Sequence, residues 1–97
     1  MTITLLDAAK AQLREGYWWY EKQDPGTGDY FLRRMYAEIE TLQHLAGIHR
    51  KFHGLHRLIP ARFPFGIFYT VSGDTVEVCA VIDLRRSPSW IRKRLRG

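Results

Sequence analysis

The chain has 97 residues, which bury enough surface for one hydrophobic core and not for two, so residues 1–97 are expected to form a single domain. Its one cysteine excludes an internal disulfide, and no apolar run approaches the ~20 residues of a membrane helix, so we expect a cytoplasmic protein that does not span a membrane. The net charge of +5 lies in residues 49–97, because residues 1–48 are roughly balanced. This basic excess indicates an acidic or polyanionic partner, unless it is simply a solvated surface.

Residues 2–5 are a short β-branched run that is predicted to be a strand, and Asp7 offers a side-chain oxygen to cap the helix that follows. The helix is predicted over about residues 7–23, where apolar side chains recur at three- and four-residue spacing. This stripe consists of Leu6, Ala9, Leu13, Tyr17 and Tyr20. Trp18 and Trp19 are ~100° apart around the helix and cannot both join the stripe. We expect an aromatic surface for a partner here, with packing at the rim of the core as the alternative.

Residues 24–28 contain a proline and two glycines and are predicted to separate this helix from a second one. The second helix is predicted to begin near Asp29, and Gly47 is placed to end it. Its apolar stripe consists of Phe31, Met35, Ile39 and Leu42, widened by Leu32 and Tyr36. The two helices are predicted to pack as an antiparallel hairpin.

The histidines gather in residues 44–56, where the spacing of the last three would permit metal ligands on one short element. They are His44, His49, His53 and His56. No carboxylate or cysteine pair accompanies them, so we expect no metal site and no cofactor. Residues 54–61 are predicted to form a third strand, in which Pro60 indicates an edge position or a bulge.

The carboxy-terminal third, residues 62–86, is predicted to be a β-hairpin. Two β-branched and aromatic runs flank a short turn in which Gly73 can adopt the positive φ of a tight reversal. In the second run Val76, Val78, Ala80 and Ile82 alternate with Glu77, Cys79, Val81 and Asp83. We therefore expect the helices to cover one face of the hairpin and to leave the other free.

A short helix is predicted to begin at Pro88, because proline is tolerated in the first turn. Trp90 is expected to pack back on the sheet, while the basic residues that follow face water. The predicted fold class is therefore α+β. Its order is β-α-α-β-β-β, with a helical hairpin on one face of a small, mostly antiparallel sheet and a short carboxy-terminal helix.

Three motifs add to this order of elements. They are Gly54-x2-Arg57, the run Arg62-Phe63-Pro64-Phe65-x-Ile67-x-Tyr69, and the ending Ala80-Val81-Ile82-Asp83-x2-Arg86-x-Pro88-x-Trp90. Over nearly its whole length the chain resembles the RelE/ParE superfamily of type II toxin–antitoxin toxins. The resemblance implies a small cytoplasmic bacterial toxin that inhibits growth and whose basic sheet face a cognate antitoxin neutralises in a hetero-oligomer.

The resemblance implies two target classes, because RelE-like members cut messenger RNA on the ribosome and ParE-like members bind DNA gyrase without known enzymatic activity. Cleaving RNA through its 2′-hydroxyl needs a base, a cation and an acid. This chain has Trp90 where RelE has a tyrosine, and Asp83 where many relatives have histidine. We therefore favour the ParE-like function, with RelE-like mRNA endoribonuclease activity as the alternative and a plain nucleic-acid-binding domain as a third hypothesis.

Candidate residues follow for each role. The expected target-binding residues are Arg57, Arg62, Arg85, Arg86 and Trp90. The expected catalytic residues of the endoribonuclease alternative are His56, Arg62, Arg85 and Arg86, with His53 as a second possible base. The expected antitoxin-binding residues are Trp18 and Trp19.

Overall fold

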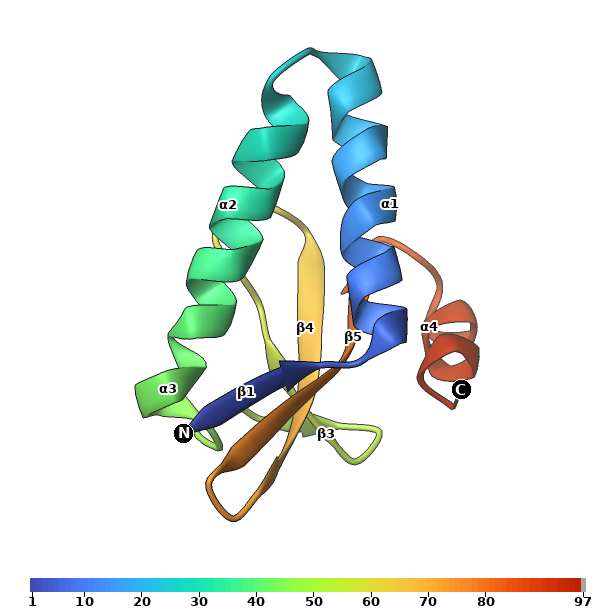
Figure 1. Cartoon of the computed structure of the whole chain (residues 1–97). Helices are drawn as coiled ribbons and strands as arrows, with labels where there is room; N and C mark the ends of the chain where they lie inside the picture. The colour runs from blue at the N-terminus through green and yellow to red at the C-terminus, as the bar shows by residue number, and fades with distance from the viewer. Residues whose placement is uncertain (97) are drawn as a thin grey trace.

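The computed structural model describes residues 1–96 and has the predicted α+β class (Figure 1). In chain order the elements are β1 (Thr2–Leu5), α1 (Asp7–Gln23), α2 (Thr27–Glu40), α3 (Leu42–Leu45), β2 (Lys51–Phe52), β3 (Leu55–Leu58), β4 (Phe65–Ser72), β5 (Thr75–Asp83) and α4 (Pro88–Leu95). The strands form one sheet in the order β1-β5-β4-β3-β2. Only the β1–β5 pair in this described sheet is parallel, which confirms the mostly antiparallel prediction.

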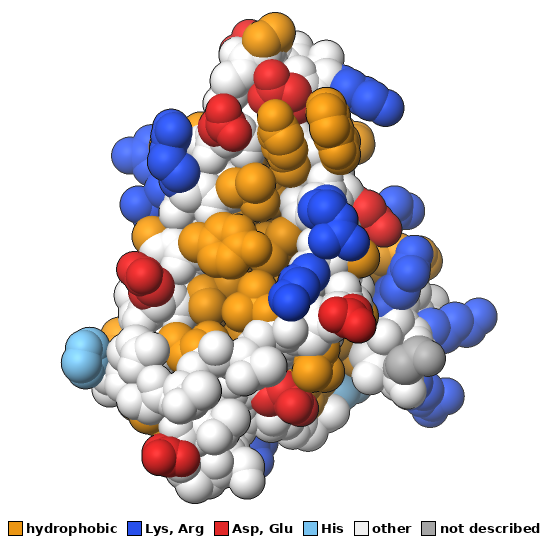
Figure 2. Space-filling view, viewed as in Figure 1, with side chains coloured by type: hydrophobic (Ala, Val, Ile, Leu, Met, Phe, Trp, Pro, Cys, Tyr) orange, Lys and Arg blue, Asp and Glu red, His pale blue; other side chains and the backbone are white. Residues whose placement is uncertain are grey.

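The α1–α2 hairpin covers one face of the sheet. Figure 2 shows hydrophobic side chains gathered over the middle of this view, between the two helices, and many Lys and Arg side chains at the right, around α4. The buried core under the hairpin includes Leu13, Phe31 and Met35 from the helices and Ile67 and Val78 from the sheet. The predicted helical stripes therefore position the two helices, although Leu6 and Tyr36 are 36% and 45% exposed.

The β4–β5 hairpin turns where the sequence predicts. Ser72 pairs with Thr75, so the turn consists of two residues, and Gly73 has a φ of 60°. A glycine in the left-handed region allows a two-residue turn that matches the twist of its strands.

The predicted continuous alternation along the second strand is wrong, because β5 contains a bulge. The register passes from Tyr69↔Val78 to Phe68↔Ala80, which leaves Cys79 without a partner on β4. An extra residue shifts the side chains beyond it to the other face. As a result Val81 joins the core under the helices, while Ala80 packs on the opposite face.

The helix ends differ from the sequence prediction. Asp7 lies in the first turn of α1 and not at its cap, and the cap position makes no side-chain hydrogen bond. The second helix begins two residues earlier than predicted, at Thr27. Its start is held by the Glu21 carboxylate, which accepts hydrogen bonds from the backbone N–H groups of Gly26 and Gly28 at 3.1 Å.

The region after α2 differs most from the prediction. A short strand, β2, was not predicted, and the third predicted strand is confined to Leu55–Leu58, so that Pro60 lies beyond its end. Two ladder pairs join β2 to β3, and His53 lies in the turn between them with a φ of 55°.

The helix α4 covers part of the opposite face, which is therefore not entirely free. Ser87 caps it by accepting a hydrogen bond from the backbone N–H of Trp90 at 3.2 Å, and Pro88 begins it as predicted. Trp90 packs against the buried cluster on this face. That cluster consists of Phe68, Ala80 and Ile82. No helix within residues 1–96 is both long and apolar enough to span a bilayer.

Candidate functional site

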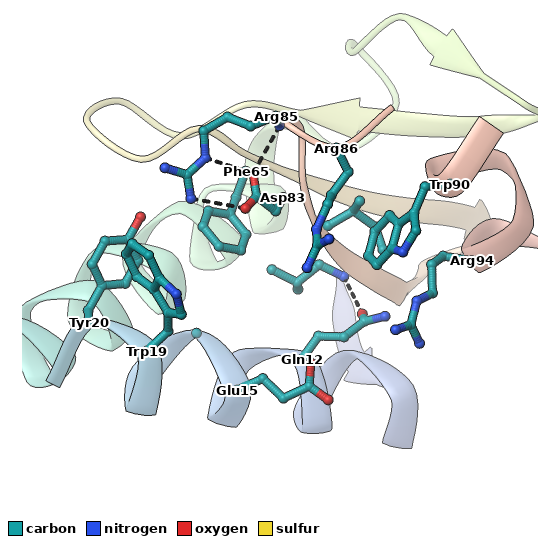
Figure 3. Close-up of a pocket in the computed structure, with 13 residues that line it drawn as sticks. Gln12, Glu15, Trp19, Tyr20, Phe65, Asp83, Arg85, Arg86, Trp90 and Arg94 are labelled. Atoms are coloured by element: carbon teal, nitrogen blue, oxygen red, sulfur yellow. Dashed lines mark hydrogen bonds and ion pairs between the residues drawn. The ribbon is translucent and has the colours of Figure 1, made fainter. Parts of the chain in front are cut away.

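An open cleft lies between α1, the end of β5 and α4 (Figure 3), and we call it the α1–α4 cleft. Its volume is about 250 Å³. The lining residues that carry chemistry are Glu15, Trp19, Asp83, Arg85, Arg86, Trp90 and Arg94. The cleft brings together four of the residues predicted from sequence, namely Trp19, Arg85, Arg86 and Trp90.

Asp83 and Arg85 form a two-point ion pair at one side of the cleft. The Asp83 carboxylate accepts hydrogen bonds from Arg85 Nε at 3.0 Å and from a terminal guanidinium nitrogen at 2.9 Å. It also accepts from the Arg85 backbone N–H at 2.9 Å. These bonds lower the pKa of Asp83 and raise the pKa of Arg85. Asp83 is therefore paired with Arg85 and is a weak proton acceptor.

Two arginines flank the Trp90 indole. The guanidinium carbons of Arg86 and Arg94 lie 4.7 and 4.8 Å from the ring centroid. Such contacts use the faces of the cations and leave their N–H groups available to an anionic partner. Within residues 1–96 neither arginine forms an ion pair. Sequence reasoning missed Arg94, although its four-residue spacing from Trp90 on a helix was a usable signal.

The two adjacent tryptophans of α1 differ in what they touch. Trp19 lines the cleft, makes an edge contact with Tyr20 at 5.0 Å and lies 5.6 Å from the Arg85 guanidinium. Trp18 packs on Tyr17 at 4.9 Å and does not line the cleft. Their side chains are exposed to similar extents, 50% for Trp19 and 57% for Trp18. The two tryptophans therefore differ in their position relative to the cleft and not in their exposure.

The histidine cluster, which consists of His49, His56 and Tyr69, lies on the helix side of the sheet. The His56 ring stacks on buried Tyr69, and its Nδ1–H donates to the His49 backbone carbonyl at 2.6 Å. The Tyr69 hydroxyl accepts from the Gly47 backbone N–H at 3.1 Å and bonds to His49 Nδ1. Burial lowers the pKa of His49, and the nearby His56 lowers it further. The Nδ1 atoms of both histidines and the Tyr69 hydroxyl are therefore engaged in hydrogen bonds.

A second cavity, the β3–α4 groove, lies on the opposite face and also has a volume of about 250 Å³. Arg57 and Arg86 line it together with His53. The Arg57 guanidinium lies 3.6 Å over the Phe52 ring, and its Nε is buried without a hydrogen-bond partner among residues 1–96. Burial, with a contribution from Arg50, lowers the pKa of Arg57.

The structure does not bring every predicted residue to one site. His56 and Arg57 are neighbours in β3, so their side chains point to opposite faces of the sheet. Arg62 is exposed in the β3–β4 loop with a φ of 79° and lines neither cavity. Residues 1–96 contain no group of three or more acidic, histidine or cysteine side chains that could hold a metal ion.

The fold of the chain, but not its sequence family, is found among known proteins. No protein-family model matches the chain, and no curated protein sequence matches it. A solved structure described as a "Chromosomal ParDE TA system from P. aeruginosa" contains a chain that superposes with a TM-score of 0.78 and 19% sequence identity. The match covers 87% of this chain and 96% of that one. The protein therefore has the fold of a chain from a toxin–antitoxin system.

Proposed function

We propose that this protein is the toxin of a type II toxin–antitoxin system and acts in the cytoplasm by ParE-like binding to an essential target such as DNA gyrase. The observation that carries the proposal is the structural likeness to a ParDE system chain over nearly its full length. Fold alone does not assign function. The residues that line the α1–α4 cleft therefore provide the evidence that distinguishes a binding function from an enzymatic one.

The lining of this cleft favours binding. It provides cations and aromatic rings, which anchor protein interfaces, and within the described chain it includes no histidine. Asp83 is held by Arg85 with a lowered pKa, so it is a poor general base. The target contacts we propose here are Arg85, Arg86 and Trp90, with Arg57 in the adjoining groove.

One observation favours the RelE-like alternative. His53, Arg57 and Arg86 line the β3–α4 groove together, and a histidine beside two arginines could supply a base and phosphate-binding cations for RNA cleavage. This endoribonuclease hypothesis differs from the binding hypothesis in requiring transcripts to be cut.

Controlled expression of the chain in bacteria tests the proposal. We expect growth arrest with intact transcripts, and we expect the purified protein to inhibit DNA supercoiling by gyrase. Growth arrest accompanied by ribosome-dependent transcript cleavage, without gyrase inhibition, would support the endoribonuclease alternative. Expression without any effect on growth would contradict both.

We also propose that a cognate antitoxin neutralises the protein in a hetero-oligomer and contacts Trp18 and Trp19. Both indoles are about half exposed, and Trp19 lies 5.6 Å from the Arg85 guanidinium, so an acidic segment could combine apolar burial with charge complementarity. Binding that combines apolar burial with charge attraction is expected to weaken as salt is added, but the complex should persist. Complete loss of the complex in about 1 M salt would show that charge alone holds it.

A further inference from the structure

The two edges of the sheet differ in how well they are protected against pairing with another chain. One edge is β2, which has only two residues, one of them Lys51. Short and charged edge strands resist such pairing. The other edge is β1 (Figure 1), whose four residues include no charged residue, proline or glycine and pair with β5 without a bulge. The strand β1 therefore lacks the features that usually block an edge.

The hydrogen bonds of β1 show which of its backbone groups are unused. The N–H groups of Thr2 and Leu6 donate to backbone carbonyls on the β5 side of the strand, at 2.8 and 3.0 Å. In a parallel pair, alternate residues of one strand bond to the same neighbour, so Ile3 and Leu5 direct their N–H and C=O groups away from β5. Within residues 1–96 no strand pairs with that outer side. It therefore presents a row of donors and acceptors to which a further strand can bond.

The side chains of β1 match those of an antiparallel second copy. Ile3 and Leu5 are half-buried and pack against the core under the α1–α2 hairpin, whereas Thr2 and Thr4 are exposed. When the Thr4 residues of two copies face each other, Ile3 of each copy lies opposite Leu5 of the other. This register places apolar side chains beside apolar ones and threonine beside threonine, and such pairs stabilise neighbouring strands. It also pairs each outward N–H with an outward C=O.

We infer that β1 is a self-association surface and that two copies of the chain form a symmetric dimer by antiparallel β1–β1 pairing about Thr4. The same strand meets itself across a two-fold axis, and the sheet continues from one copy into the other. A second copy fits this edge better than an acidic partner does, because β1 carries no charged side chain to attract one. No residue of β1 lines the α1–α4 cleft or the β3–α4 groove, so the inference is independent of the proposed function.

Sedimentation velocity tests whether the dimer forms. A pair of four-residue strands buries less than the ~1,200 Å² of a typical stable interface, so we expect a weak dimer that appears as the protein concentration rises. The chain carries a net charge of +5, and added salt should therefore strengthen the association by screening the repulsion between copies. A chain that stays monomeric at every concentration and salt would overturn the inference.

Charges placed at the two-fold axis locate the contact. Thr4→Lys and Thr4→Glu each set two like charges opposite one another, so either variant alone is expected to dimerise at least about tenfold more weakly. An equal mixture of the two variants should dimerise again, because opposite charges then meet at the axis. Ser72→Lys and Ser72→Glu are matched controls, since Ser72 is an exposed residue of the inner strand β4, and each should change dimerisation by about twofold or less. Equal losses for the Thr4 and Ser72 variants, or a mixture that stays monomeric, would show that the contact lies elsewhere.

Amide hydrogen exchange of the unsubstituted chain tests the same strand without a mutation. The N–H groups of Ile3 and Leu5 are expected to exchange more slowly as the protein concentration rises, because the second copy accepts their hydrogen bonds. The N–H of Thr2, which already donates to the Asp74 carbonyl, should keep its rate. Ile3 and Leu5 amides that exchange equally fast at concentrations where sedimentation detects monomer and dimer would overturn the assignment of the dimer to β1.

Discussion

The α1–α4 cleft presents arginines without a histidine among its lining residues, whereas the histidine cluster presents imidazoles without an arginine. In the cleft, Arg86 and Arg94 contact an indole face and keep their N–H groups free of ion pairs within residues 1–96. In the histidine cluster, His56 and His49 bond to the backbone and to Tyr69. The cleft arginines keep their N–H groups available, whereas the Nδ1 atoms of His49 and His56 are engaged within the fold, and His53 is the histidine that lies with arginines, in the β3–α4 groove. This difference favours a binding protein.

The largest effect is expected from removing the Trp90 indole, which lies between Arg86 and Arg94. Trp90 packs against the cluster under α4, so Trp90→Ala should lower the free energy of unfolding by ~2 to 3 kcal/mol. Urea denaturation measures the change, and Trp18→Ala, on the exposed side of α1, is the matched control. An unchanged stability would mean that Trp90 contributes nothing to holding α4 and is wholly available to a partner.

The second change addresses the histidine cluster. Tyr69→Phe removes the buried hydroxyl that bonds to Gly47 and His49, leaving both groups without that partner. We expect a loss of ~1 to 2 kcal/mol in unfolding free energy with little effect on growth arrest. Tyr36→Phe, on the exposed surface of α2, serves as the control. A stable Tyr69→Phe protein that no longer arrests growth would place the hydroxyl in the functional site.

The smallest effect concerns pH. His49 has a lowered pKa in the folded protein, so the unfolded chain binds more protons than the folded one near and below the ordinary pKa of ~6.5. The neutral imidazole therefore stabilises the fold above that pH, and this contribution is lost as the pH falls through the folded-state pKa. His49→Gln should flatten the dependence of unfolding free energy on pH between about 7 and 5. A slope identical to that of the unsubstituted protein would contradict this account.

The parts of the fold that could be predicted are those that local pattern determines. The turn at Gly73 and the apolar stripe of α2 depend on residues near in sequence, and the structure confirms both. The bulge at Cys79 could not be predicted, because Val78, Cys79 and Ala80 are all apolar or small and show no break in alternation. The strand β2 has only two residues and exists through its pairing with β3.

The candidate site was predictable in part for the same reason. Motif resemblance selected Arg86 and Trp90, and helical periodicity showed that two adjacent indoles could not both be buried. Neither pattern indicated that Trp19 rather than Trp18 lines the cleft, because that choice depends on the packing of elements distant in sequence. Alternation along the predicted third strand was the signal that could have separated His56 from Arg57.

Growth arrest by histidine variants tests the central claim most directly, namely that the protein acts through its cationic cleft and not through a histidine base. We would express His56→Ala, and His56→Asn as a variant whose amide can still donate to the His49 carbonyl, and compare them with Arg86→Ala. We expect both folded histidine variants to arrest growth with transcripts intact. Arg86→Ala should weaken target binding by ~1 to 3 kcal/mol and relieve the arrest. Folded His56 variants that lose both growth arrest and ribosome-dependent transcript cleavage would contradict the claim and establish the endoribonuclease alternative.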